Sequence, residues 1–236
     1  METENAVAKP KTRLRRFLKG AAIVGVSFLA LLFVARTLWR FSGSNRWELV
    51  RDQNGVKVYT LKAPGSDLIQ VMGVTQIHST MAGLVKFMTD PDACKDYHCH
   101  HVTNVEHVDD QLDYVSFQFN TPFPFRTREL LIRQEVHQNA RTKEVLLVFA
   151  AAPDEAPPND CCFRITNMSN TWRLTPQANG QIGIVYLMNM NEGGYLPDLL
   201  LNWQRPKLVY RVLRGLQGLV ERPKYQTAKL AYIAER

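Results

Sequence analysis

Three kinds of hydrophobic patterning follow one another along the chain. Residues 20–35 form an uncharged apolar run. With its flanks, from Phe17 to Trp39, the run would span about 34 Å as a helix, enough for a hydrocarbon core of ~30 Å. Basic side chains border this run directly, which favours a transmembrane helix over a buried core helix.

Alternating apolar and polar residues, the pattern of half-buried strands, dominate residues 47–190. The alternation is clearest in 112–120. Further strands are predicted at 56–59, 68–77, 102–108, 128–137, 143–152, 161–175 and 181–190. Asn54-Gly55 and Asn179-Gly180 predict hairpin turns, because both residue types tolerate positive φ.

One helix is predicted among these strands and a second helix after them. A short helix should begin after a Ser79 cap and end at Pro91. A long amphipathic helix is expected over 199–220, with Pro206 as a kink or in its first turn. The order of elements indicates an α+β domain, in which the concave face of a curved antiparallel sheet grips the C-terminal α-helix. Such a sheet encloses volume that an apolar ligand can fill.

This patterning divides the chain into five parts. We expect a basic cytoplasmic tail at 1–19, a transmembrane signal anchor at 20–39, a linker at 40–46, a folded domain at 47–225 and a C-terminal tail at 226–236.

Charge is concentrated at the N-terminus. The chain has 29 basic and 22 acidic side chains, of which residues 1–40 hold eight and two. The remaining domain is nearly neutral, so the net charge of +7 does not indicate nucleic-acid binding. More Lys and Arg precede the apolar run than follow it, which places the N-terminus in the cytoplasm and the domain on the other side.

An uncleaved anchor competes with a cleaved signal peptide for residues 20–35. Phe33 occupies the −3 position relative to Ala35, where signal peptidase prefers a small residue, so the anchor is favoured. The alternative is a secreted or periplasmic domain released after cleavage.

The chemistry-bearing residues give weak signals. Cys94 and His98 to His101 resemble metal ligands, but adjacent residues cannot all converge on one ion, and no metal site is predicted. Free, buried thiols are expected. A Cys94–Cys99 disulfide is the alternative, whereas Cys161 and Cys162, adjacent on a strand, would face opposite sides. No motif for nucleophilic catalysis or phosphate binding occurs, so no catalytic residue is predicted.

Five motifs in order carry a family resemblance across about residues 46–225. They are Trp47-Glu48-Leu49 with Asn54 to Tyr59, Thr121 to Glu129, Arg164 with Trp172 to Pro176, Asn179-Gly180, and Gly193 to Pro197 with Leu201-Asn202. In combination they resemble the START (steroidogenic acute regulatory-related lipid transfer) family, in a membrane-anchored form of bacterial type.

The resemblance implies a helix-grip fold with one lipid, such as a sterol or phospholipid, held between sheet and C-terminal helix for transfer or sensing. It implies no enzyme activity and no cofactor, and we expect a monomer whose partners are the lipid and the membrane. The loop Pro122-Phe123-Pro124-Phe125 would form one lip of the entrance, either inserted in the bilayer or packed under the helix. The alternative is a helix-grip enzyme, of the cyclase or hydratase type, acting on an apolar substrate.

One departure from the family concerns its cavity. Many members place an arginine, paired with an acid, where this chain has Gln134, so Arg133 and Asp113 become the candidate pair. The other expected ligand contacts are Phe117, Trp203 and Tyr210. Arg128 and Glu129 are interpreted as a structural ion pair.

Overall fold

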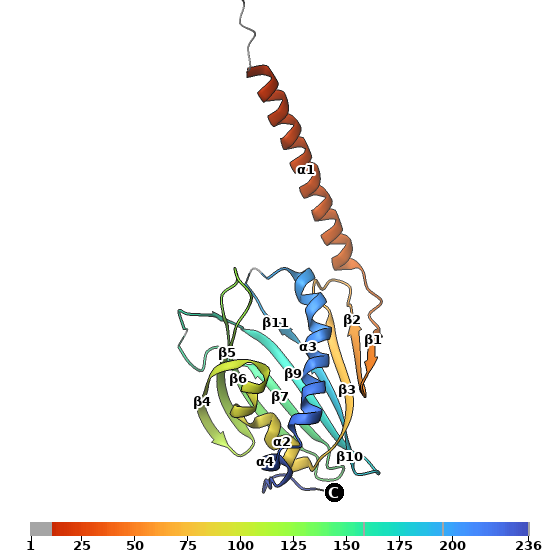
Figure 1. Ribbon diagram of the computed structural model, residues 1–236, viewed down its shortest axis with the longest axis vertical. Helices are drawn as coiled ribbons and strands as arrows, with labels where there is room; N and C mark the ends of the chain where they lie inside the picture. Colours follow the sequence, from red (N-terminus) through yellow and green to blue (C-terminus); the bar gives the residue numbers. More distant parts are fainter. Residues whose placement is uncertain (1–10, 158, 195, 236) are drawn as a thin grey trace, which may run out of the picture.

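A long N-terminal helix leads into an antiparallel sheet that curves around a second long helix (Figure 1). The computed structural model describes residues 11–157, 159–194 and 196–235, leaving aside the side chains of 11–14. Residues 1–10 of the expected basic tail, and Tyr195 in one of the five motifs, lie outside the described residues. The α+β arrangement predicted from the patterning is confirmed.

The sheet has the strand order β1-β2-β3-β10-β9-β7-β6-β5-β4, with β11 beside β9 and β8 beside β6. Neighbouring strands are antiparallel except β6 and β8. The bounds are β1 Trp47–Gln53, β2 Val56–Leu61, β3 Gln70–His78, β4 Cys99–Asp109, β5 Leu112–Phe119, β6 Arg128–Gln138, β7 Val145–Ala151, β8 Phe163–Arg164, β9 Asn167–Pro176, β10 Gln181–Met188 and β11 Met190–Asn191.

Two predicted strands are each divided. The one expected at 161–175 separates into β8 and β9, because β8 pairs with β6 whereas β9 pairs with β7 and β10. The one expected at 181–190 breaks at Asn189, whose N–H donates to the side chain of Asn170 at 2.9 Å instead of continuing the ladder. The predicted turn at Asn54-Gly55 is confirmed, with φ of 52° and 72°.

Helix α2, Met81–Thr89, starts one residue later than the predicted cap implies. Thr80, not Ser79, caps it, and the Thr80 hydroxyl accepts from the Gly83 N–H at 3.0 Å. Pro91 opens a 3₁₀ helix, η1, over Pro91–Tyr97. A short helix α4, Pro223–Gln226, follows the long helix and has no counterpart among the predictions.

Helix α3, Asp198–Leu219, lies across the concave face of the sheet, as predicted (Figure 1). Pro206 falls inside it rather than in its first turn. Gly73 permits the close approach to β3, since a Cβ there would lie 2.4 Å from Leu213 Cδ1 and 2.6 Å from Val209 Cγ1. These contacts fix the helix against one half of the sheet and leave room beside the other half.

The cysteines are paired, so the expectation of free thiols is wrong. Disulfides join Cys94 to Cys99 and Cys161 to Cys162. The second pair lies in a turn before β8 rather than on a strand, so the strand rule that sets adjacent side chains on opposite faces does not apply.

Residues beyond 225 pack against the domain. Ile233 is buried, and the Glu235 carboxylate accepts from the Met81 and Ala82 N–H groups, both at 2.9 Å, at the start of α2. An acidic group at a helix N-terminus satisfies free donors and the helix dipole together. Residues 226–235 therefore help to hold α2 in place.

Helix α1, Lys11–Phe41, contains one stretch, Arg15–Phe41, that is long and apolar enough to cross a membrane. None of that stretch is buried against the protein. Its last turns contact the domain through Trp39 Nε1, which donates to the Asp67 carbonyl at 2.9 Å, and through Arg36, which lies 3.6 Å from Asp198 at the start of α3. The helix thus leaves the domain at the end where α3 begins.

Candidate functional site

A cavity of about 270 Å³ lies between the sheet, the α2–η1 segment and the C-terminal half of α3. The sheet contributes Val102, Val115, Phe117, Ile132, Gln134, Phe149, Asn170, Trp172 and Tyr186. The α2–η1 segment contributes Phe87 to Pro91, Ala93, Cys94 and Tyr97, and α3 contributes Val212 and Leu216. Most of these side chains are apolar, so the cavity suits an apolar ligand.

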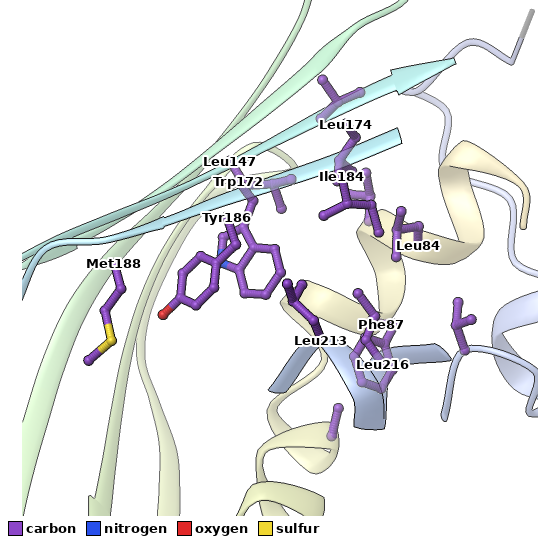
Figure 2. Packing of buried hydrophobic residues seen from close by; sticks show 14 of the residues in the cluster. Leu84, Phe87, Leu147, Trp172, Leu174, Ile184, Tyr186, Met188, Leu213 and Leu216 are labelled. Carbon is purple, nitrogen blue, oxygen red and sulfur yellow. The ribbon is translucent and has the colours of Figure 1, made fainter. Parts of the chain in front are cut away.

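Strand alternation decides which residues reach the cavity. On β6, Ile132 and Gln134 line it, whereas Arg133 between them is exposed on the outer face. On β9, Asn170 and Trp172 share the inner face in the same way. The rings of Trp172 and Tyr186 stack with centroids 3.9 Å apart, and Figure 2 shows both on the same side of the sheet, with the Trp172 indole next to Leu213.

Several polar groups lie among these apolar walls. Gln134 is 6% exposed and Tyr186 is 7% exposed. Within the described residues, the Gln134 amide, the Tyr186 hydroxyl and the Trp172 indole N–H form no hydrogen bond with the protein. Burial, and after it the negative charge of Glu192, raises the pKa of Tyr186, so its hydroxyl stays protonated. The cavity therefore offers uncharged donors and acceptors.

The rim of the cavity is more polar and already bonded. Burial opposes ionisation of Asp90, but hydrogen bonds from Lys224 (2.8 Å), the Asp92 N–H (2.9 Å) and Tyr225 (2.9 Å) hold its pKa below the usual value. Burial and the nearby Asp96 raise the pKa of Tyr97, whose hydroxyl donates to the Val212 carbonyl at 3.2 Å. These groups fasten η1 to α3 and α4 around the opening.

Comparisons with known proteins address the fold. No protein-family model matches the sequence. An uncharacterised protein of Pseudomonas aeruginosa is 24% identical over 210 residues, which cover 89% of this chain and 98% of that protein. A fragment of a STAR-related lipid transfer protein from Xanthomonas axonopodis has a TM-score of 0.69 at 22% identity, covering 75% of this chain and 99% of that one. The chain has a START-like fold.

Human proteins share this START-like fold at lower identity. STARD10 has a TM-score of 0.67 at 13% identity over 78% of this chain and 77% of its own. StAR-related lipid transfer protein 5 has a TM-score of 0.63 at 17% identity, covering 85% and 96%.

Of the residues predicted to contact the ligand, some line the cavity of this START-like domain and others do not. Phe117 lines the cavity. Asp113 and Arg133 do not: the Asp113 carboxylate lies 2.6 Å from His107 Nδ1, and Arg133 pairs with Glu135 at 3.1 Å on the outer face. The suggested acid–arginine pair is not formed, because positions 133 and 134 face opposite sides of β6.

The two predicted contacts on α3 also lie away from the cavity. Trp203 is 61% exposed, and the Lys207 ammonium lies 3.1 Å from its ring centroid. Tyr210 is buried, but its hydroxyl accepts from Asn54 at 2.7 Å at the β1–β2 turn, beneath the Arg51 guanidinium. Val212 and Leu216, two and six residues after Tyr210, are the α3 side chains that line the cavity.

The predicted entrance loop, Pro122 to Phe125, contributes no residue to the described lining. Phe123 is 96% exposed, and Pro122 and Pro124 are exposed beside it. The loop thus presents an aromatic ring to its surroundings, at a distance in sequence from the α2–η1 rim that the structure places at the cavity.

Arg128 and Glu129 are buried but do not pair with each other, since neighbouring strand residues point to opposite faces. Glu129 pairs with Arg164 at 2.9 Å. Arg128 donates to the carbonyls of Glu192 (3.3 Å) and Gly193 (3.2 Å). Both residues are structural in this arrangement, with partners other than those predicted.

Sequence reasoning missed Gln134, Trp172 and Tyr186 as cavity residues. Gln134 was marked by its position, where the START resemblance places a cavity arginine. Trp172 and Tyr186 lie within predicted strands, but which face each strand turns to α3 depends on register, and the two become neighbours only through the β9–β10 pairing.

Proposed function

We propose that this chain binds a single lipid or similar apolar ligand in the cavity beneath α3, for transfer or sensing at a membrane. The observation that carries the proposal is an apolar cavity of about the size of a small ligand. Its polar groups, such as the Gln134 amide and the Tyr186 hydroxyl, form no hydrogen bond within the described residues. Solved structures with the same fold include STAR-related lipid transfer proteins, and that activity fits this cavity.

The cavity volume, about 270 Å³, lies near the lower limit for small-molecule pockets of roughly 300–1,000 Å³. A small lipid or a single acyl chain suits it without change. A sterol or phospholipid would require the α2–η1 rim or α3 to move outward, and such motion would also admit the ligand.

Binding without catalysis fits the lining better than the enzyme alternative. A cyclase or hydratase would need at least two titratable groups with suitable pKa values in the cavity. The titratable groups of the described lining are Asp90, held in an ion pair, and the protonated hydroxyls of Tyr97 and Tyr186. They are suited to holding a ligand rather than moving its protons.

We further propose that α1 is an uncleaved single-pass anchor, with the N-terminus cytoplasmic and a monomeric domain on the outer side. Its length and composition support a membrane span, and the two disulfides fit an oxidising, extracytoplasmic compartment. The exposed Phe123 loop would then be available to touch the bilayer. The competing outcome is a released domain after signal cleavage.

Lipid content of the purified protein tests the binding proposal. The full chain is extracted from membranes into amphipol, and bound lipid is quantified by mass spectrometry against protein. We expect about one lipid per chain. Val212→Phe, which fills the cavity, should lower that ratio, whereas Val108→Phe, at an exposed site on β4, should not. Equal lipid in both variants, or none in the wild type even after incubation with liposomes, would contradict the proposal.

A further inference from the structure

We propose that the cavity selects an uncharged lipid with hydrogen-bonding groups, such as hydroxyls, and that Gln134 and Tyr186 bind these groups. The inference rests on the proposed function, because it specifies the ligand class of the same cavity. It follows from the position, bonding and charge of the polar residues on the inner face of the sheet.

The polar residues form one continuous patch. Gln134 on β6 is opposite Phe149 on β7, which is opposite Asn170 on β9. Trp172 follows Asn170 on the same face and is opposite Tyr186 on β10. Directly opposed residues have Cβ atoms about 4.5–5.5 Å apart, so one small headgroup can contact neighbouring members of the row. Gln134 and Tyr186 stand at the two ends of the row, three strands apart, and bind separate groups. All five side chains line the cavity.

Polar atoms in this patch lack protein partners. The Gln134 and Tyr186 side chains are more than nine-tenths buried, but their amide and hydroxyl stay open to the cavity and form no hydrogen bond within the described part of the chain. The Asn170 side-chain carbonyl accepts from the Asn189 N–H, which leaves its amide N–H groups for other partners. Buried polar groups without partners are costly, so a ligand that bonds to them gains affinity.

No free charge faces this patch among the described residues. Each acidic group near it already has a basic partner: Asp113 with His107, Glu192 with Arg205 and Asp90 with Lys224. Arg133, beside Gln134 in sequence, points to the outer face. A buried ion requires a counter-ion, and neither an anionic nor a cationic headgroup would find one here. An uncharged headgroup meets no such penalty.

Three ten-carbon probes test the selectivity: 1-decanol, decanoate and decylammonium at pH 7.5. The full chain is held in amphipol, and each probe competes with the uncharged fluorophore N-phenyl-1-naphthylamine, with protein-free amphipol as the blank. We expect decanol to bind at least about tenfold more tightly than either ion, because both signs of charge are desolvated without a partner.

Variants assign the preference to the patch. At least one of Gln134→Leu and Tyr186→Phe should weaken decanol binding by roughly two- to tenfold, the value of one hydrogen bond, because the single hydroxyl bonds at one end of the row. Gln118→Leu makes the same chemical change on the neighbouring strand β5, outside the cavity lining, and should leave decanol binding unchanged. Gln134→Lys should raise the affinity for decanoate relative to decanol, a gain that misfolding cannot imitate.

The outcomes separate this inference from the proposed function. If all three probes bind equally, or if Gln134→Leu and Tyr186→Phe both bind decanol like the wild type, the cavity binds lipid without the proposed selection. Tighter binding of one ion would show an unpaired charge in the cavity and overturn the inference. If no probe displaces the fluorophore, the proposed function fails and the inference fails with it.

Discussion

Side-chain direction along β6 determines which polar residues can meet a ligand. Arg133 and Gln134 are neighbours in sequence, yet one pairs with Glu135 on the outer face and the other lines the cavity. A displacement of one residue in register would exchange them. The sequence alone showed that Gln134 occupies the position of the family's arginine. Which face of the sheet Gln134 lies on depends on the pairing of β6 with β5 and β7, which the sequence does not show.

Asp113 provides a prediction at the same scale. The hydrogen bond that His107 donates to the Asp113 carboxylate, and then the negative charge of Asp113, raise the pKa of the exposed His107. We expect an NMR titration to place the His107 midpoint above the ordinary value of about 6.5, and Asp113→Asn to return it toward that value.

The sign of the linked stability follows from the raised pKa. The His107–Asp113 pair stabilises the fold fully below the unfolded-state pKa, and this contribution is lost as the pH rises through the folded-state pKa. Because Asp113 lies outside the described lining, Asp113→Asn should leave lipid content unchanged. An unchanged His107 midpoint, or a loss of lipid, would contradict this placement.

At the scale of elements, the sequence predicted strands and helices well where a local pattern defines them. The hairpin at Asn54-Gly55 and the amphipathic α3 are examples. Prediction was poorer where distant segments decide. The break between β8 and β9 arises from a change of partner strand, and α4 is held by contacts with α2 and η1. Neither leaves a periodic signal in its own residues.

The packing of α3 on β3 predicts opposite effects for two glycine substitutions. Gly73→Ala would place a methyl group within 2.4–2.6 Å of Leu213 and Val209, so the helix must shift. We expect a loss of about 1–3 kcal/mol in the free energy of unfolding. At Gly218, which lies in α3, an added methyl group meets nothing within 4 Å. Gly218→Ala should therefore raise the free energy of unfolding by about 0.5–1 kcal/mol. Urea titrations followed by tryptophan fluorescence would measure both, and equal effects of one sign would contradict this packing.

The Cys94–Cys99 disulfide fastens η1 to β4 beside the cavity, and Cys94 itself lines that cavity. Cys94→Ser with Cys99→Ser should lower the free energy of unfolding by about 2 kcal/mol, because the unfolded chain gains the freedom of the opened loop. The looser rim should also speed lipid exchange between liposomes and protein. Cys161→Ser with Cys162→Ser is the matched control, since that pair lies outside the described lining, and equal exchange in the two double variants would show that η1 does not gate the cavity.

At the scale of the whole molecule, the proposed anchor helix α1 joins the domain at one end of the helix that covers the cavity. Helix α1 meets the domain through Asp67 and Asp198, at the end where α3 begins (Figure 1). Residues 42–46, the short connection after α1, reach at most about 18 Å when fully extended. A domain held so close to its membrane would exchange lipid with that bilayer far more readily than with a distant one.

This arrangement predicts the topology of the intact protein. In a Gram-negative host we expect the full chain to remain in alkali-washed membranes, because about 27 residues of apolar helix are retained. Protease added to spheroplasts should digest the domain, while a tag fused before Met1 stays protected as a small membrane-bound fragment. The excess of basic residues before the apolar run favours this orientation. Replacing Lys11, Arg13, Arg15 and Arg16 with Gln should reduce the charge bias and expose the tag in part of the population.

A soluble periplasmic product beginning after residue 35 would instead establish a cleaved signal and a domain free to carry lipid between membranes.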